Sequence, residues 1–272
     1  MNREADPPKK DTRKHVKHAY PCYIPDISGN EGKGYKFMTT GKFYGIGVGP
    51  GDPELITLKA IRVLEHCNVI AAPRTRGGGM RALDIAGQAV SLQDKTILPL
   101  SFAMSSDRSL LREQYQRNAE LIRAYLEKGE DTAMICIGDV SVFSTVCQIA
   151  DVLKEMGCQT CLVPGISSYS AIAARMGISL TEGSRPFHVL PVSDVDLEQA
   201  LSLEGTKVLM KAGSKMPAVL DLLKERDLMS VSSLAVSCGC PDEKIMERLD
   251  KESDLSPEDS YMSTVIVRDR NL

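Results

Sequence analysis

The chain has 272 residues, of which 43% are hydrophobic, and its formal net charge at pH 7 is −3. This size and apolar content predict one large domain or two smaller ones, each with a hydrophobic core. The charge gives no reason to expect nucleic acid or an anionic membrane as a partner, and no apolar run reaches the roughly 18–20 residues of a membrane span.

Residues 1–37 differ in composition from the rest of the chain. They are polar, with more Lys and Arg than Asp and Glu, scattered Pro and Gly, and no apolar periodicity. We expect a flexible N-terminal extension here. The first residues also lack the apolar core of a secretory signal, so the expected location is the cytoplasm.

From residue 43 onward, apolar strand-like runs alternate with segments of helical periodicity. The expected strands are 43–48, 68–72, 131–137 and 159–163, and the expected helices are 57–65, 79–91, 107–128, 144–156 and 168–176. Because proline interrupts the hydrogen bonds between strands, we expect the second strand to end before Pro73. The alternation predicts a mostly parallel sheet with helices on its faces, in a domain of residues 38–183.

A turn-rich stretch at 180–186 predicts a linker to a second, smaller α/β domain of residues 187–272. The strands expected in this domain are 187–190, 206–211, 233–237 and 263–267, and a helix is expected at 216–225. The expected fold class is therefore α/β with two domains. A cleft between two such domains is a common place for a ligand.

A glycine-rich turn lies between the first expected strand and helix, within KFYGIGVGPGDPELITL at 42–58. It does not match the dinucleotide fingerprint G-x-G-x-x-G, because the sixth position is Pro50 counted from Gly45 and Asp52 counted from Gly47. No carboxylate ends the second strand to hold a ribose, and no Gly-Lys-Ser/Thr follows to make a P-loop. Taken alone, the stretch is also compatible with a turn that only joins strand to helix.

Further motifs give this turn a context. GPGDPELITL is followed by IGDVSVFS at 137–144, VPGISSY at 163–169, LMKAG at 209–213 and YMSTVI at 261–266. In order and spacing these motifs resemble the tetrapyrrole (precorrin/corrin) methyltransferases over nearly the whole chain from Lys42 onward. Val140 departs from the pattern, since the family usually has Pro there, whereas Gly138 and Asp139 match it.

Other stretches narrow the resemblance within the family. PELITLKAIRVLE, LPLSFAMSSDR, GDVSVFST, PGISSYSAIAARMG and GCPDEKI are most similar to the branch that methylates carbon 20 of precorrin-2 or cobalt-precorrin-2. The implied activity is therefore a methyl transfer in corrin (vitamin B12) biosynthesis. No residue decides between the metal-free and the cobalt-containing substrate.

The resemblance implies a class III methyltransferase that binds S-adenosylmethionine in the cleft between its domains, largely through backbone groups. The implied cofactor-binding residues are Pro50, Ile137, Gly138, Asp139, Val142, Phe143, Ser167, Ser168, Met210, Ser263 and Thr264. Some have structural alternatives. Asp139 is equally suited to capping a turn, the two serines to capping a helix, and Met210 to packing in a core.

The implied substrate carries eight carboxylates, which calls for cationic donors at the mouth of the cleft. The substrate-binding candidates are Gly51, Asp52, Arg74, Arg76 and Arg108. The glycines at 77–79 give the neighbouring arm the freedom to close over a large flat substrate. A solvated surface loop is the alternative interpretation for each arginine.

No catalytic residue stands out. A sulfonium is already a strong electrophile and a reduced tetrapyrrole a nucleophile, so alignment supplies much of the rate. Tyr169 and Asp52 are candidates to assist proton loss, while His188 lies in an apolar setting typical of a packed residue. The cysteine pairs 158/161 and 238/240 are too far apart for a zinc ribbon, so we expect no metal.

Several alternatives stay open. Within the family, they are a methyltransferase for another precorrin position and diphthine synthase. A nicotinamide-dependent oxidoreductase is a different class, opposed by the failed fingerprint. A third class is a non-catalytic scaffold that keeps the fold and binds S-adenosylmethionine without turnover. The resemblance also implies a homodimer.

Overall fold

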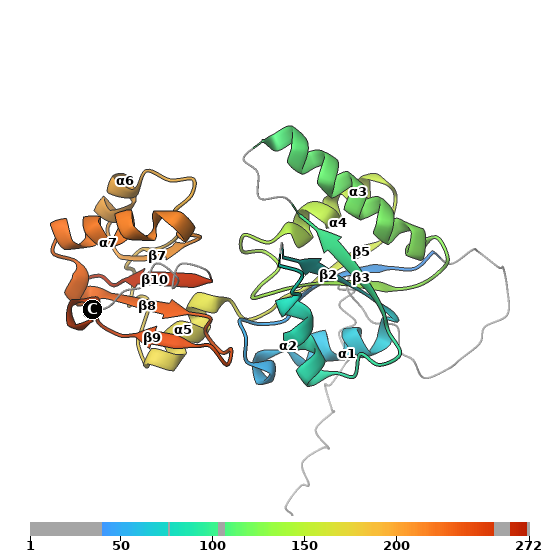
Figure 1. Cartoon of the computed structure of the whole chain (residues 1–272), viewed down its shortest axis with the longest axis horizontal. Helices are drawn as coiled ribbons and strands as arrows, with labels where there is room; N and C mark the ends of the chain where they lie inside the picture. The colour runs from blue at the N-terminus through green and yellow to red at the C-terminus, as the bar shows by residue number, and fades with distance from the viewer. Residues whose placement is uncertain (1–39, 76, 103–106, 253–261, 271–272) are drawn as a thin grey trace, which may run out of the picture. The chain divides into compact units, whose positions relative to one another are not determined.

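The computed structural model describes residues 40–75, 77–102, 107–252 and 262–270, so the extension expected at 1–37 lies outside them (Figure 1). The first half of this region forms a sheet of order β3-β2-β4-β1-β5. Its strands are β1 (Phe43–Gly47), β2 (Val69–Arg74), β3 (Thr96–Ser101), β4 (Thr132–Cys136) and β5 (Thr160–Val163). Every pairing between them is parallel, which confirms the predicted parallel sheet.

Helices cover both faces of this sheet, α3 and α4 on one face and α1 and α2 on the other (Figure 1). The helices of this half are α1 (Leu58–His66), α2 (Arg81–Ala89), α3 (Arg108–Leu126), α4 (Thr145–Glu155) and α5 (Ser168–Met176), and a 3₁₀ turn, η1 (Pro53–Leu55), precedes α1. Thr57, Asp107 and Ser144 start three of them, because each side chain accepts a backbone N–H of the first turn. None of the described helices is long and apolar enough to cross a membrane.

Apolar side chains form the core between the sheet and helices α3 and α4. Its fully buried side chains include Phe43, Ile122, Met134, Ile149 and Leu153. Gly45 of β1 lets α4 approach the sheet, because a Cβ at this position would clash with Cγ1 of Val146. The alternation of buried strands and one-sided helices thus follows the apolar pattern of the sequence.

The second strand runs further than the proline rule predicts. β2 continues through Pro73 to Arg74, so that prediction is wrong. β4 pairs with β2 only from Val69 to Ala71, and beyond Ala71 the one described strand that pairs with β2 is β3. Proline lacks an N–H, and it is tolerated where a strand has a neighbour on one side only.

The second sheet has the order β6-β7-β10-β8-β9. Its strands are β6 (Phe187–Pro191), β7 (Thr206–Met210), β8 (Ser232–Val236), β9 (Lys244–Met246) and β10 (Ser263–Val267), accompanied by α6 (Leu197–Ser202) and α7 (Met216–Glu225). β6 and β7 are parallel, whereas β10 is antiparallel to β7 and β8. This confirms a second α/β unit. We keep residues 38–183 and 187–272 as proposed domains.

Helix α5 follows the first sheet but packs on the second. One buried cluster unites α5, β7, β8 and β10 through Ala171, Ile172, Val208, Ala235 and Ile266. Leu55 of η1 and Met210 of β7 pack against the same cluster. Apolar contacts therefore extend from the glycine-rich turn to the second sheet.

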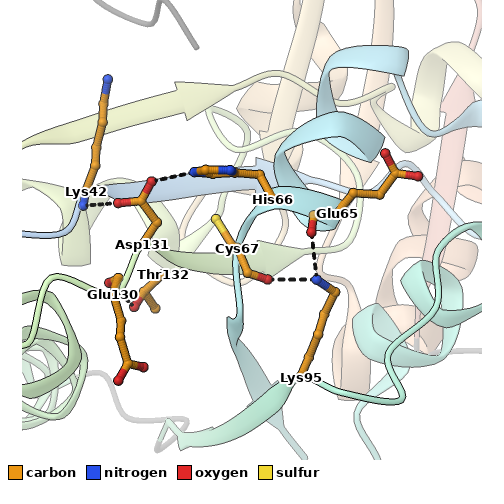
Figure 2. Close-up of polar contacts among 8 residues, drawn as sticks. All are labelled: Lys42, Glu65, His66, Cys67, Lys95, Glu130, Asp131 and Thr132. Carbon is orange, nitrogen blue, oxygen red and sulfur yellow. Dashed lines mark hydrogen bonds and ion pairs between the residues drawn. The ribbon is translucent and has the colours of Figure 1, made fainter. Parts of the chain in front are cut away.

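Polar contacts close the edge of the first sheet at which β1 and β4 begin (Figure 2). Asp131 accepts a hydrogen bond from the backbone N of Lys42 at 2.7 Å, and its other oxygen lies 2.8 Å from Nε2 of His66. These residues come before β1, before β4 and at the end of α1. The three elements are therefore joined at the end of the strands that lies opposite the motif loops.

Lys95 stabilises the end of helix α1 at the same edge (Figure 2). Its Nζ donates to the carbonyl oxygens of Glu65 at 3.0 Å and Cys67 at 2.8 Å. A cation at these carbonyls satisfies groups that the helix leaves unbonded. Burial, and then the nearby Asp131 carboxylate, raises the pKa of the Cys67 thiol to about 12, so it stays protonated.

Candidate active site

Loops of the predicted motifs meet at the carboxyl-terminal edge of the first sheet. Because β4, β1 and β5 are adjacent and parallel, the loops that follow them leave the sheet at the same edge. The N–H of Val48 donates to the carbonyl of Cys136 at 2.9 Å, and the N–H of Gly138 donates to the carbonyl of Gly49 at 2.7 Å. The glycine-rich turn is thus bonded to the loop of the second motif.

Glycine is required where these loops touch. A Cβ at Gly47 would lie 2.5 Å from the carbonyl oxygen of Gly138 and 2.7 Å from the N of Gly165, closer than side-chain atoms pack. Gly49 and Gly138 have φ angles of 77° and 74°, in the left-handed region that favours glycine. The turn therefore does more than join strand to helix, because its glycines let three backbone segments approach one another.

Asp139 joins the second motif to the third. The residue is only 9% exposed. Its Oδ1 accepts hydrogen bonds from the N–H of Ser141 at 2.9 Å and from the Ser141 hydroxyl, and its Oδ2 accepts one from the N–H of Gly165 at 2.9 Å. Burial alone would raise the pKa of Asp139, but the hydrogen bonds outweigh burial and lower it. These contacts support orientation of the loops as the role of this carboxylate.

The second motif also reaches the second sheet. Phe143 and Lys211, the residue after β7, have left-handed backbones with φ angles of 50° and 56°. The Nζ of Lys211 lies 5.2 Å from the centre of the Phe143 ring and donates to the Phe143 carbonyl at 3.4 Å. A left-handed conformation at a non-glycine residue costs about 1–3 kcal/mol and persists only where the surroundings enforce it.

The residues predicted in the second domain lie at one edge of its sheet. Met210 is opposite Thr264, and Ser263 is opposite Val236. Ser263 and Thr264 are buried, and Met210 is half-buried. Left-handed, non-glycine residues flank these positions, namely Lys211, Ser237 and Met262. Strained backbone of this kind clusters at ligand sites.

The first motif contacts a loop that follows β8. A Cβ at Gly51 would lie 2.6 Å from the carbonyl oxygen of Cys238, and a Cβ at Gly239 would lie 2.5 Å from the N of Asp52. Asp52 caps η1, because its Oδ1 accepts the N–H of Glu54 at 2.9 Å. Gly51 and Asp52 thus form a close contact between backbones, and the Asp52 carboxylate is engaged in a cap.

A pocket of about 270 Å³ lies beside the second motif. The predicted residues Ile137, Val142 and Phe143 line it, together with Arg81 of α2. A larger cavity of about 310 Å³ lies against the second sheet beside Arg248, and none of the predicted residues that the structure describes lines it. We therefore place the candidate site at the smaller pocket and the motif loops that adjoin it.

Two of the arginines chosen from the sequence, Arg74 and Arg108, do not line this pocket. Arg74 ends β2 and Arg108 begins α3, and both are exposed. Arg76 lies outside the described residues. Sequence reasoning missed Arg81, although a signal for it exists, since it follows the glycine-rich arm at 77–79 by two positions.

The third motif begins helix α5. Ser167 is the N-cap residue, but its side chain makes no capping hydrogen bond, and Ser168 is the first helical residue. The capping alternative is therefore not supported for Ser167. The Tyr169 ring packs edge-on against Phe187 with the ring centres 5.6 Å apart, an arrangement typical of a structural aromatic pair. Pro50, at the tip of the first turn, is buried.

Comparison with known proteins agrees with this geometry. Residues 42–251 match the family of tetrapyrrole (corrin/porphyrin) methylases. A protein of Methanocaldococcus jannaschii, named probable cobalt-precorrin-2 C(20)-methyltransferase, is 31% identical over 229 residues, covering 84% of this chain and 96% of that protein. The cobalt-precorrin-2 C(20)-methyltransferase of Salmonella typhimurium is 30% identical over 232 residues, covering 84% and 96%.

Solved structures share the fold. A cobalt-precorrin-4 methyltransferase matches with a TM-score of 0.62 at 19% identity, covering 84% of this chain and 94% of that one. The uroporphyrin-III C-methyltransferase of Thermus thermophilus, complexed with S-adenosyl homocysteine, matches with a TM-score of 0.60 at 20% identity, covering 84% and 92%. At these identities the likeness concerns the fold alone. With the family match, it follows that the chain belongs to the tetrapyrrole (corrin/porphyrin) methylases and is a methyltransferase.

Proposed function

We propose that the protein methylates carbon 20 of precorrin-2 or cobalt-precorrin-2 in corrin biosynthesis, with S-adenosylmethionine as the methyl donor. The observation that carries this proposal is the meeting of the motif loops with the strained edge of the second sheet. The two relatives described above bear names for this reaction. So does a Sinorhizobium protein named precorrin-2 C(20)-methyltransferase, which is 26% identical over 239 residues.

The proposed cofactor site lies above Gly138. Among the described residues, a Cβ at this position would meet no atom closer than the Ile166 carbonyl oxygen at 3.9 Å, so the space over its backbone is open to them although its φ favours glycine. This arrangement suits a ligand held by main-chain groups. We retain as proposed cofactor contacts the residues Pro50, Ile137, Gly138, Asp139, Val142, Phe143, Ser167, Ser168, Met210, Ser263 and Thr264.

The chemistry proposed for the site is positioning. When bound, S-adenosylmethionine supplies an electrophilic methyl group. Ile137, Val142 and Phe143 give the pocket an apolar wall that keeps water from the reacting atoms. Asp139 holds two of the loops together, so that the site does not have to reorganise during transfer. Alignment of this kind supplies a large part of the rate without a protein nucleophile.

The remaining assignments are expectations that follow from the family. Gly51, Asp52, Arg74, Arg76 and Arg108 stay predicted substrate contacts. We also propose that the protein is a homodimer and that it is located in the cytoplasm. Sedimentation equilibrium of the purified chain tests the oligomeric state directly. A monomer at micromolar concentration contradicts the proposed oligomeric state.

Turnover followed by mass spectrometry tests the proposal. The protein is incubated anaerobically with S-adenosylmethionine and either precorrin-2 or cobalt-precorrin-2. We expect a mass gain of one methyl group on the ring, with S-adenosylhomocysteine formed in step, and the faster substrate identifies the natural form of the ring. If the protein binds S-adenosylhomocysteine but methylates neither tetrapyrrole, the proposed substrate is contradicted. That outcome favours another substrate of the family or a non-catalytic scaffold.

A further inference from the structure

The described residues around the pocket beside the second motif include one charged side chain. Among its described lining residues, Arg81 is the charged member, and the others are apolar or neutral, including Thr75, Cys136 and Val142. A small number of polar groups in an otherwise uncharged pocket fix the orientation of a ligand. A single guanidinium in this setting calls for an anionic group on the molecule that enters.

Contacts from the second sheet hold this guanidinium in place. Nη1 of Arg81 donates to Oγ of Ser237 at 3.2 Å and lies 3.3 Å from Sδ of Met262, while Nη2 donates to Oδ2 of Asp242 at 3.1 Å. Ser237 Oγ also donates to the same Asp242 oxygen at 3.0 Å. Ser237 and Met262 are two of the left-handed residues at the edge of that sheet.

The partner of Arg81 is a charged carboxylate that is open to solvent. The hydrogen bond from the Ser237 side chain, opposed by burial and assisted by the Arg81 contact, lowers the pKa of Asp242, so this carboxylate is ionised near neutral pH. The Asp242 side chain is 56% exposed and that of Arg81 is 37% exposed. Exposed ion pairs contribute little to stability, so stabilisation of the fold is a weak explanation for the pair of Arg81 and Asp242.

We propose that Arg81 binds a carboxylate of the ligand in this pocket, and that Asp242 and Ser237 position its guanidinium for that contact. The planar fork of arginine matches a carboxylate through two parallel hydrogen bonds. This inference rests on the proposed function, which offers two sources of the carboxylate: the rim of the tetrapyrrole, or the amino-acid end of S-adenosylmethionine.

Substitution of Arg81 tests the proposal and separates the two sources. R81Q and R81K are compared with wild type for KM of the tetrapyrrole, KM of S-adenosylmethionine and calorimetric Kd of S-adenosylhomocysteine. Loss of a charged hydrogen bond predicts a rise of about 10- to 100-fold in the constant of the ligand that Arg81 contacts, with R81K intermediate. A rise in the tetrapyrrole KM alone assigns the contact to the ring, and a rise in both cofactor constants assigns it to the cofactor.

R117Q is the matched control, because Arg117 is an exposed residue of α3 that does not line the pocket and its loss changes the net charge equally. D242N tests positioning. We expect it to raise the same constant as R81Q by a smaller factor and to leave the other unchanged. The proposal is overturned if R81Q alters no binding constant by more than twofold. It is equally overturned if R81Q and D242N weaken both ligands alike while lowering the melting temperature to the same extent.

Failure of the proposed function is visible separately. If wild-type protein methylates neither tetrapyrrole, the proposed function fails. The Arg81 contact is then still measured through the Kd of two probes, S-adenosylhomocysteine and uroporphyrin III. Uroporphyrin III is a fluorescent tetrapyrrole with eight carboxylates. An unchanged Kd for both probes in R81Q then overturns the inference. A tenfold weaker Kd for either probe supports it.

Discussion

Asp139 and the glycines around it set the geometry of the candidate site. The carboxylate accepts backbone hydrogen bonds from its own loop and from Gly165 of the next motif. Gly47 lies against both loops with no room for a side chain. At this scale the site depends on main-chain positions, because the residues that could act as acids or bases, Asp52 and Tyr169, are engaged in a cap and in ring packing.

Replacement of Asp139 by Asn is expected to destabilise the fold. The NH2 group of the amide would replace one acceptor oxygen and would face an N–H or hydroxyl donor. Loss of a buried, charge-assisted hydrogen bond costs about 2 kcal/mol. Urea unfolding measures this difference. D151N is the control, since Asp151 is an exposed residue of α4, and an exposed pair of this kind contributes less than about 1 kcal/mol. Equal losses in the two variants contradict the assigned role.

The same carboxylate predicts a pH dependence. Hydrogen bonds lower the pKa of Asp139 in the folded protein despite burial. Its stabilising effect is therefore full above the ordinary value of about 3.9 and is lost as the pH falls through the lower folded-state pKa. The stability gap between wild type and D139N should stay constant from about pH 7 to 5 and narrow below about pH 4. A gap that widens with acid contradicts this sign.

A Cβ at Gly47 is expected to separate the motif loops. It would meet Gly138 and Gly165 within 2.7 Å, so the backbones must move apart. Overpacking of this kind costs about 1–3 kcal/mol, and G47A should also weaken binding of S-adenosylhomocysteine, measured by calorimetry. G77A is the control for stability, because a Cβ at Gly77 meets no atom of the described residues within 4 Å. Normal cofactor binding by G47A contradicts the proposed cofactor site.

Helix α1 illustrates how an element can serve the fold without serving the site. Its last carbonyls are bonded to Lys95, and its final residue, His66, contacts Asp131 (Figure 2). These groups lie at the amino-terminal edge of the first sheet. The motif loops leave the sheet at the other edge. The contacts of α1 therefore stabilise the fold, whereas the motif loops form the candidate site.

K95M is therefore expected to lower stability and leave catalysis unchanged. Two hydrogen bonds to helix-end carbonyls are lost, with an expected cost of about 1–2 kcal/mol in the free energy of unfolding. K154M, which removes a more exposed lysine paired with Asp151 on α4, should cost less than about 0.5 kcal/mol. A fall in kcat/KM of K95M at a temperature where it stays folded argues against this division.

Most elements could be predicted from the sequence because buried strands and one-sided helices leave a periodic apolar pattern. β3 and β9 were missed. Both are edge strands, but so are β5 and β6, which were predicted, and the difference lies in their sequences. β3 contains Pro99, and among its residues Leu100 alone is buried. β9 is three residues long and begins with Lys244. Edge strands need less apolar content and carry charges and proline, which hides them from a periodicity search.

The site was predictable where motifs are local and not where it depends on distant pairs. The loops of the glycine-rich turn and of the second and third motifs stand out by composition. Arg81 and Asp242, in contrast, are 161 residues apart, and only the folded chain shows that they touch. The left-handed backbones of Ser237 and Met262 are equally invisible in the sequence, because neither is a glycine.

At the scale of the whole chain, the two sheets contribute different parts of one candidate site. The first supplies the glycine-containing loops, and the second supplies the strained edge that carries Met210, Ser263 and Thr264. Contacts such as that of Lys211 with Phe143 join these parts. The family match covers the first sheet and the second sheet apart from β10, because it ends at residue 251.

The position of the transferred methyl group tests the central claim most directly. The protein is supplied with S-adenosylmethionine that carries a ¹³C-labelled methyl group and with the preferred tetrapyrrole, and the product is examined by ¹³C NMR. We predict a single labelled methyl group bonded to the meso carbon 20. A label on any other ring carbon, or on a heteroatom, contradicts the proposed reaction even if the methyl count is correct.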